Sequence, residues 1–518
     1  MMEKKPGSKM SHLRAISSLA EPRRLCFAAM LTCCLLLPSI YLIIFLKPLC
    51  FLKFEQSVSF TVQVQKVQKT SVETAMETRS LPLVEEEKEE AHLSLPTKAN
   101  LTQKGGSPLG GKSLVKDTPE TSVFCDTSQE RYDACVLTGD IRVVSNSSRI
   151  IAVAASQPSN VSWKIRPYPR KWEPPLMIRI KELSVSSSAS TPDGAAPPCT
   201  VTHTTPAVVF STGGFSGNFF HDTSDILIPL FATSHDFYGE VRFLVVDFSS
   251  RFVAKYKPLL SRLSRHELIN LDDNDDVHCF PEVRAGLINN KELGIDQANP
   301  PRGATMQGFR DLLRSSLSLK RKNVARRGKN KPRLLVQLRK GSRELLNSRE
   351  VIKMARKMGF RVVVTGPEET KNITSYSAIV NSVDALLGVH GAGLTNMVFL
   401  PDGAAMVQIV PWGSLMWACR FSYGDPAIGM GLRYFEYEIK EEESSLIEQY
   451  PRDHLVFTNP LEIHKQGWNM LWYVFLEKQK LRVDLQRFNE TLIEVLRYLK
   501  QEKAMPGSSK NASFFSVA

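Results

Sequence analysis

The second half of the chain alternates short apolar runs with a segment of helical periodicity. The apolar runs predict buried strands over residues 334–338, 360–364, 385–389 and 405–410. Between the first two, apolar side chains recur at helical spacing until Gly359, which ends the predicted helix; they are Val351, Met354, Ala355 and Met358. Strands that alternate with helices predict a mostly parallel, doubly wound sheet, in which ligands bind beyond the carboxyl ends of the strands.

The first half of the chain carries a similar pattern, which predicts a second lobe. Residues 207–210 and 241–246 are predicted strands, and a buried helix is predicted over residues 226–231 between them. The predicted fold class is therefore α/β, with two Rossmann-like lobes. We place them at residues 119–325 and 326–518, the second with a return helix.

The N-terminal end contains an apolar segment, residues 25–46, that is long enough to span a bilayer as one helix. Arg23 and Arg24 precede it, so residues 1–24 are predicted to be cytosolic and the rest luminal. A cleaved signal peptide is the alternative, which the length of the segment and the lack of a clear cleavage site disfavour. Residues 47–118 contain an acidic run and then scattered Pro, Ser, Thr, Gly and Lys, which predicts a disordered stem.

Two further features agree with a luminal location. Six acceptor triplets for N-glycosylation follow the apolar segment, at Asn100, Asn146, Asn160, Asn372, Asn489 and Asn511. Five cysteines lie beyond Cys50, and an oxidising lumen allows one or two disulfides, of which Cys125–Cys135 is the most local candidate. These cysteines are too scattered for a zinc site, so they predict no metal.

The net charge of +13 is local. Residues 302–343 contain fourteen Lys or Arg and one Asp, so the rest of the chain balances to zero. A general role in binding polyanions, nucleic acid included, is thereby disfavoured. Over residues 320–331 a solvated basic loop is the preferred interpretation, whereas the end of the run is better suited to attracting an anionic donor or an acidic glycan.

Candidate phosphate-binding residues follow two strands of the second lobe. The strand at 385–389 leads into four residues, His390, Gly391, Ala392 and Gly393, and then into a predicted helix. Small residues let a phosphate approach the backbone, and free N–H groups at a helix start can hold it; a tight turn with no ligand is the alternative. Arg339 and Arg343 follow the first strand of the lobe, where their paired N–H donors can bind a diphosphate. No G-x-x-x-x-G-K-[ST] phosphate loop is present.

Candidate acid–base residues follow the strand at 207–210 in the first lobe. His221 and Asp225 are four residues apart, on one face of a helix, and either can take a proton from an acceptor hydroxyl. Asp222 at the helix start is better explained as an N-cap. The acidic run at 272–276 lacks the glycine and the distal glutamate of a calcium loop, so a solvated turn is preferred to a metal site.

Together these residues resemble the plant members of glycosyltransferase family 61, which contains xylan arabinosyl- and xylosyltransferases. The resemblance runs from about Phe124 to Leu499, and its motifs are residues 217–222, 277–286, 291–296, 339–347, 388–393 and 450–454. It implies a GT-B architecture, inversion at the anomeric carbon, and no essential metal or other cofactor. On the matching positions it implies Asp225 as the base, ahead of His221 and Asp222. It also implies that Arg339, Arg343 and residues 390–393 bind the donor.

The resemblance also implies a substrate class and a location. We expect a type II protein of the Golgi membrane that transfers a pentose, arabinofuranose or xylose, from a UDP-sugar to xylan or its side chains in cell-wall synthesis. Trp163, Tyr168, Trp172 and Trp468 are candidates for stacking on acceptor sugars, although core packing accounts for at least half of them. Two alternatives stay open: xylose transfer to N-linked glycans, and a catalytically silent Golgi protein that binds glycans or stabilises a complex.

Overall fold

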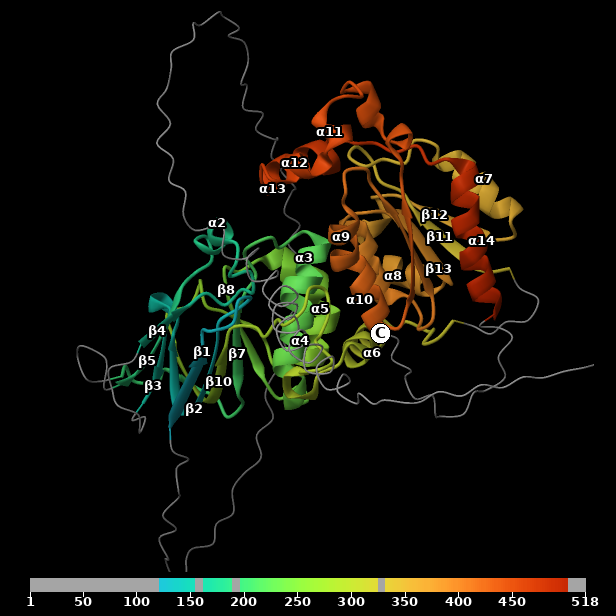
Figure 1. Ribbon diagram of the computed structural model, residues 1–518. Helices are drawn as coiled ribbons and strands as arrows, with labels where there is room; N and C mark the ends of the chain where they lie inside the picture. The colour runs from blue at the N-terminus through green and yellow to red at the C-terminus, as the bar shows by residue number, and fades with distance from the viewer. Residues whose placement is uncertain (1–120, 154–161, 189–195, 325–330, 502–518) are drawn as a thin grey trace, which may run out of the picture. The chain divides into compact units, whose positions relative to one another are not determined.

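The computed structural model describes residues 121–501, apart from 154–161, 189–195 and 325–330 (Figure 1). These residues belong to one compact unit of the chain. The predicted membrane helix at 25–46 and the predicted stem lie outside them. Within the described part of the chain, no helix has the length and apolarity needed to cross a bilayer.

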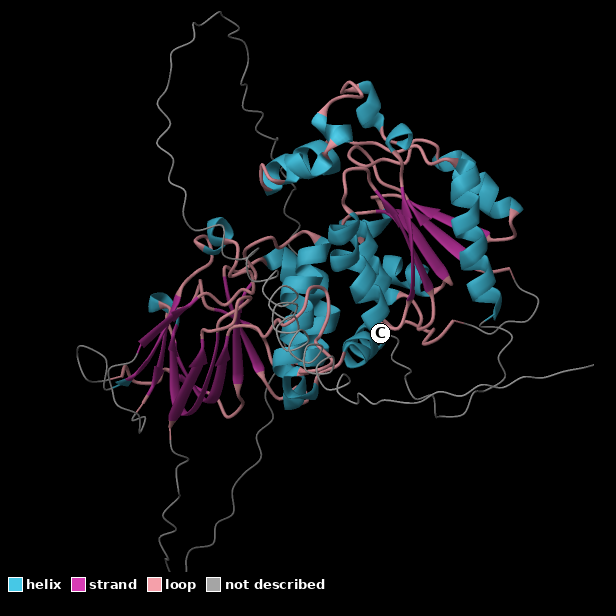
Figure 2. Cartoon of the chain, in the orientation of Figure 1, coloured by secondary structure: helices cyan, strands magenta, loops and turns pink. Residues whose placement is uncertain are grey.

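The C-terminal sheet has five strands, all parallel, in the order β12-β11-β13-β14-β15 (Figure 2). The strands are β11 (Arg333–Gln337), β12 (Arg361–Thr365), β13 (Ala385–Val389), β14 (Ala405–Val410) and β15 (Arg433–Glu438). The four predicted strands are confirmed to within one residue at each end, and β15 is additional. β13 and β14 are buried along their whole length, which explains why the sequence shows continuous apolar runs instead of alternation.

Helices cover both faces of this sheet. Leu334 and Val336 of β11 pack in one core cluster with α7 (Ser348–Lys357) and α14 (Leu485–Gln501), while Leu335 between them packs on the opposite face. The predicted helix at 351–358 is confirmed as α7, and Gly359 follows it with φ +104°. The other helices of this lobe are α8 (Ile373–Asn381), α9 (Met416–Cys419), α10 (Asp425–Gly429), α11 (Leu455–Thr458), α12 (Pro460–His464) and α13 (Trp468–Leu471).

The N-terminal sheet departs from the prediction of a Rossmann-like lobe, because it is mixed. Its ten strands are β1 (Ser122–Asp126), β2 (Ala134–Val144), β3 (Arg149–Ala152), β4 (Ser162–Ile165), β5 (Leu183–Ser187), β6 (Val201–Thr202), β7 (Ala207–Ser211), β8 (Arg242–Val246), β9 (Ile269–Asn270) and β10 (Val277–Ala285). β10, β7, β8 and β9 are parallel neighbours, as expected, but β2 pairs antiparallel with β10, β3 and β1. Half of β2 is only partly buried, a pattern that antiparallel sheets tolerate and parallel ones rarely show.

Two disulfides fasten the antiparallel part of the N-terminal sheet. Cys125 and Cys135 are opposite each other on β1 and β2, which confirms the most local predicted pair. Cys199 bonds Cys279 of β10. Cys419 is the remaining cysteine of the described segments, and it is buried with a free thiol.

The helix after β7 contains a wide turn. It begins as α3 (Phe219–His221), continues as a π-helical turn over Asp222–Leu227, and becomes α4 (Ile228–Ser234). Such a turn holds one more residue than an α-helical turn and is frequent at functional sites. The predicted buried helix at 226–231 is confirmed in part, because its first two residues belong to the wide turn.

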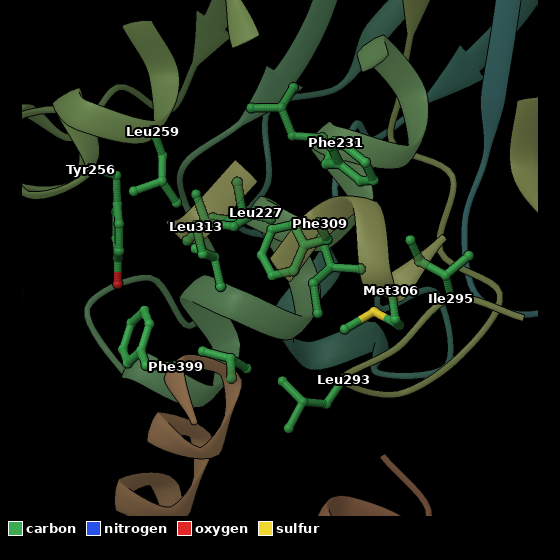
Figure 3. Close-up of a cluster of buried hydrophobic side chains, with 14 of the residues drawn as sticks. Leu227, Phe231, Tyr256, Leu259, Leu293, Ile295, Met306, Phe309, Leu313 and Phe399 are labelled. Carbon is green, nitrogen blue, oxygen red and sulfur yellow. The ribbon is translucent and has the colours of Figure 1, made fainter. Parts of the chain in front are cut away.

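One hydrophobic cluster joins elements of both lobes (Figure 3). Phe231 of α4 contacts Phe309 of α6 (Met306–Ser316), with ring centroids 5.8 Å apart. α5 (Ser250–Leu263) contributes Tyr256 and Leu259, and Phe399 comes from the C-terminal lobe. This shared core fixes α3 and the wide turn against the segment that follows β13. A short helix, α2 (Pro174–Met177), lies between β4 and β5.

Candidate active site

The carboxyl ends of β11 and β13 bring the predicted donor-binding residues together. These two strands are neighbours, although β12 lies between them in the sequence, so the chain leaves β11 and β13 toward opposite faces of the sheet. This reversal is the topological switch point at which open α/β sheets bind ligands. Arg339 and Arg343 follow β11, and residues 390–393 follow β13, so both loops border the same point.

The two arginines pack directly over the backbone of Gly391. A β-carbon at this position would lie 2.1 Å from Nη1 of Arg339 and 3.3 Å from Nη1 of Arg343, and φ of Gly391 is +142°. Nη1 of Arg343 donates to the carbonyl of His390 at 3.2 Å, and Nε of Arg339 donates to the carbonyl of Ser342 at 3.3 Å. Glycine is therefore required here for steric reasons, and what it makes room for is a pair of guanidinium groups.

Arg343 is buried, Arg339 is partly buried, and the pair lacks a counter-charge. Neither arginine forms an ion pair with any described residue, and Nε of Arg343 is buried without a hydrogen-bond acceptor. Burial, and then the charge of Arg339, lower the pKa of Arg343 below its usual range, to about 10. Burial also lowers the pKa of Arg339. Two desolvated cations side by side are unfavourable unless an anion joins them, and a diphosphate matches their fork of N–H donors.

His390 is a neutral donor beside this pair. Burial, followed by the charges of Arg343 and Arg339, lowers its pKa to about 3. Nδ1 of His390 lies 2.8 Å from Nε2 of Gln408, and Oε1 of Gln408 accepts a hydrogen bond from Tyr434. The amide nitrogen of Gln408 therefore donates to Nδ1 of His390, and the imidazole proton lies on Nε2 of His390.

A cavity of about 670 Å³ adjoins the turn and has walls from both lobes. Ala392 and Gly393 line one wall, at the start of a 3-10 helix over Ala392–Phe399. Gly217, Phe219 and Lys255 line the opposite wall. The cavity has the size of a site for a small organic ligand, and it connects the turn after β13 with the loop that leads into α3.

On the N-terminal side, Asp225 is the centre of a buried polar network. Its Oδ2 accepts hydrogen bonds from Tyr168 (2.8 Å), Nε of Arg170 (2.8 Å) and Nδ1 of His221 (2.9 Å), and its Oδ1 accepts from Nη2 of Arg170 (3.1 Å). Glu292 pairs with Arg170 at 2.9 Å and with Arg131 at 2.6 Å. Burial alone would raise the pKa of Asp225, but the hydrogen bond from His221 and the charge of Arg170 outweigh it and hold the pKa below its usual value.

The network leaves His221 as the more accessible titratable group. Asp225 has no exposed surface, whereas 18% of the His221 side chain is exposed. Because Nδ1 of His221 donates to Asp225, its Nε2 carries the free lone pair. Phe215 packs against the ring of His221, with centroids 4.5 Å apart. Asp225 therefore orients His221 and is shielded from solvent itself.

Asp222 has a different role from the predicted helix cap. The cap of α3 is Asn218, whose side chain accepts a hydrogen bond from the backbone N–H of Phe220. Asp222 lies inside the wide turn and reaches back to the backbone N–H of Gly217 at 2.7 Å; it also accepts from Tyr256 at 2.6 Å. Its carboxylate thus fastens the glycine loop that borders the cavity.

Aromatic rings connect the two parts of the site. Phe220 contacts His221 and Tyr423, with centroid distances of 5.3 and 5.6 Å, and Tyr423 contacts His390 at 5.4 Å. The acid–base network and the arginine pair therefore belong to one connected site.

Comparison with known proteins agrees with this geometry. The family model described as Glycosyltransferase 61 matches residues 217–407. The beta-1,2-xylosyltransferase XYXT1 of Oryza sativa subsp. japonica is 37% identical over 75% of this chain and 87% of its own length. The chain belongs to glycosyltransferase family 61.

Two further relatives bear on substrates. The alpha-1,3-arabinosyltransferase XAT2 of Oryza sativa subsp. japonica is 42% identical over 73% of this chain, and the chain spans 65% of the length of that relative. The xylan glycosyltransferase MUCI21 of Arabidopsis thaliana is 35% identical over 72% of this chain and 79% of its own length.

The family 61 segment contains all the predicted catalytic and donor-binding residues but not every residue of the network. Tyr168, Arg170 and Arg131 lie before residue 217, and the sequence analysis did not single out the two arginines. Tyr168 was one of four candidates for stacking on an acceptor sugar, of which at least half were expected to pack in the core; it is buried, and its hydroxyl donates to Asp225. Trp163 packs against a core cluster, whereas Trp172 and Trp468 are 41% and 60% exposed.

The remaining predicted sites are placed as follows. Asn146, Asn372 and Asn489 lie within the described residues, and Asn100, Asn160 and Asn511 lie outside them. In the acidic run at 272–276, Asp272 pairs with Lys181 and accepts from the backbone of Phe248. Asp140, Cys199 and Cys279 form the one metal-like cluster among the described residues, but both sulfurs are joined in a disulfide.

Proposed function

We propose that this family 61 chain is an inverting pentosyltransferase. It transfers arabinofuranose or xylose from a UDP-sugar to xylan or its side chains in cell-wall synthesis. The activities after which the rice and Arabidopsis relatives are named supply the substrate class. The observation that carries the proposal is the arginine pair at the switch point. Arg343 is buried, Arg339 is partly buried, neither has a carboxylate partner among the described residues, and a cavity of nucleotide size adjoins the turn that they contact.

In the proposed mechanism, Arg339 and Arg343 bind the diphosphate of the donor. As the bond between the anomeric carbon and the phosphate oxygen breaks, the leaving UDP takes the electron pair, and the two guanidinium groups stabilise the added charge. Arg339 and Arg343 supply this positive charge from the protein itself. His390, neutral with its proton on Nε2, adds one hydrogen-bond donor to the same turn.

The acceptor hydroxyl is activated by His221, with Asp225 as the positioning residue. Nε2 of His221 takes the proton while the acceptor oxygen attacks the anomeric carbon, and Asp225 stabilises the imidazolium that results. A single displacement of this kind inverts the configuration. This assignment replaces the expectation that Asp225 is itself the base, because both of its oxygens already accept hydrogen bonds in a site closed to solvent.

The architecture and location form part of the same proposal. We place the donor in the C-terminal lobe of a GT-B arrangement, with lobes at 119–325 and 326–518. The protein is held in the Golgi membrane by the helix predicted at 25–46.

A transfer assay with paired variants tests the proposal. Full-length chain in detergent is incubated with UDP-arabinofuranose or UDP-xylose and xylo-oligosaccharides, and products are identified by a mass gain of one pentose. His221→Asn should lower kcat about a hundred-fold to ten-thousand-fold while UDP affinity stays at the wild-type level. If the His221→Asn variant is active and the Asp225→Asn variant is folded but inactive, Asp225 is the base instead of His221. UDP binding without transfer to any glycan would favour the silent Golgi protein, and transfer to N-linked glycans alone the other alternative.

A further inference from the structure

A second cationic pocket lies at the opposite edge of the C-terminal sheet, where its strands begin. It has a volume of about 980 Å³. Arg333, the first residue of β11, and Arg361, the first residue of β12, both line it and are direct neighbours in the parallel register.

Most cations of this pocket have no anionic partner. Arg321 pairs with Asp384 at 2.6 Å, and Asp384 is the one carboxylate in the lining. Five further cations form no ion pair with any residue that the structure describes. They are Lys320, Lys322, Lys331, Arg356 and Arg361. All five are exposed, so a ligand in the pocket can reach them.

The negative ends of two helices offset only a small part of this positive charge. α7 ends at Lys357 and α8 at Asn381, beside Arg356 and Ser382 of the pocket. A helix C-terminus carries about half a negative charge, so the two ends supply about one unit. With Arg333 left aside, six cations against one carboxylate and this unit leave about four positive charges around the cavity. Four of the six, Lys320, Arg321, Lys322 and Lys331, come from the segment expected to be a solvated basic loop, of which residues 325–330 lie outside the described residues.

The pocket is separate from the donor site. β11 begins at Arg333 in the pocket and ends at Gln337, which lines the donor-side cavity. Five residues of extended strand span about 16 Å. A ligand held at the strand starts is therefore too far from the switch point to be the reacting sugar.

We propose that this pocket is an exosite for a carboxylate-bearing segment of the polysaccharide acceptor. The proposal rests on the proposed function, which makes the acceptor a polymer long enough to reach both edges of the sheet. Uronate carboxylates accept paired N–H donors from guanidinium groups such as those of Arg356 and Arg361. A cavity of about 980 Å³ can hold sugar residues, whereas a flat bilayer surface cannot fill it. The exosite retains the polymer while its reacting residue is held near His221.

Two double variants with the same change in charge test the exosite. Arg356→Gln with Arg361→Gln removes two pocket cations, and Arg349→Gln with Lys353→Gln removes two exposed cations of α7 that do not line it. The ligands are a glucuronate-substituted xylan, the same polymer after chemical reduction of its carboxylates, and vesicles containing phosphatidylserine. Affinities are measured on the full-length chain in detergent, or reconstituted for the vesicle arm, at two salt concentrations.

We expect the pocket variant to bind the acidic xylan about three- to thirty-fold more weakly than wild type, with a smaller dependence on salt. The α7 variant should bind like wild type, and kcat on a short neutral xylo-oligosaccharide should be unchanged in both. Three results would each overturn the exosite: wild type binding the carboxyl-reduced polymer as tightly as the acidic xylan, the two double variants losing the same affinity, or the pocket variant losing affinity for the vesicles alone. If the wild-type protein binds the acidic xylan through its carboxylates but transfers no pentose, the proposed function is overturned and the exosite stands.

Discussion

Replacing Arg343 with methionine should stabilise the protein and weaken UDP binding at the same time. The pKa of Arg343, lowered by burial to about 10, corresponds to a cost on the order of 3 kcal/mol for keeping this guanidinium charged in its buried position. Because the folded-state pKa lies below the unfolded one, the cost is present in full at neutral pH, begins to fall above about pH 10 and is gone only above the unfolded-state pKa. Methionine keeps an apolar stem of similar length and removes the charge.

The expected magnitudes follow from the contacts of this side chain. Methionine loses one hydrogen bond to the carbonyl of His390, worth about 1 kcal/mol, so the net gain in unfolding free energy should be about 2 kcal/mol. Loss of a charged hydrogen bond to the diphosphate should cost about 1.5–3 kcal/mol of UDP binding, or roughly ten- to 150-fold in Kd. UDP at a hundred times its wild-type Kd should stabilise the wild-type protein by about 2.7 kcal/mol and the variant far less.

Thermal unfolding with and without UDP, together with titration calorimetry, measures both effects. Arg314→Met is the matched control, since Arg314 is equally buried but pairs with Asp311 and Asp402. Its loss removes the ion-pair partner of Asp311 and one of the two partners of Asp402, which keeps Arg310. The control should therefore unfold at a lower temperature and bind UDP normally. If Arg343→Met is destabilised like the control and still binds UDP, the interpretation of the arginine pair as an anion site is wrong.

Three other predictions concern neighbouring residues. Asp225→Asn should lower kcat and leave KM for the UDP-sugar unchanged, because the neutral amide no longer stabilises a proton taken up by His221; a change in KM with kcat unchanged would contradict the positioning role. Asp222→Asn should lower the unfolding temperature through its weakened hold on Gly217, and leave kcat near the wild-type value. Asn372 lines the donor-side cavity, so a glycan there would enter it; glycopeptide mapping should find Asn372 unmodified in UDP-binding protein, and a glycan in fully active protein would refute this.

The parallel sheet was predictable because β11, β13 and β14 are short apolar runs that are buried along nearly their whole length. The edge strand β12 keeps an apolar run although it is only partly buried, whereas the other edge strand, β15, alternates charged and aromatic residues and was missed. The antiparallel strands were not predictable, and β10 shows why. It contains Pro281 at a bulge between Phe280 and Glu282, and proline in an apolar run argues against a strand. The pairing with β2 depends on a partner more than a hundred residues away, which periodicity cannot reveal.

The site shows the same division between local and distant information. His221 and Asp225 were found because four residues separate them, and Arg339 and Arg343 because each follows a predicted strand. Arg170, 55 residues before Asp225, has no local signal for its role. Without Arg170, the sequence does not show that both oxygens of Asp225 already accept hydrogen bonds. These hydrogen bonds are the reason for proposing His221 as the base.

The wide turn over Asp222–Leu227 makes the number of residues, and not only their identity, critical for this protein. Deleting one residue between His221 and Asp225 would let the turn close as a regular α-helix, in which the two are three residues apart instead of four. One residue corresponds to about 100° around the helix axis, so His221 would no longer meet Asp225 in the present geometry, because Tyr168 and Arg170 hold Asp225 from another part of the chain. A frame-preserving deletion here should therefore abolish transfer even in a protein that folds, and natural variation in length should fall in the surface loops instead.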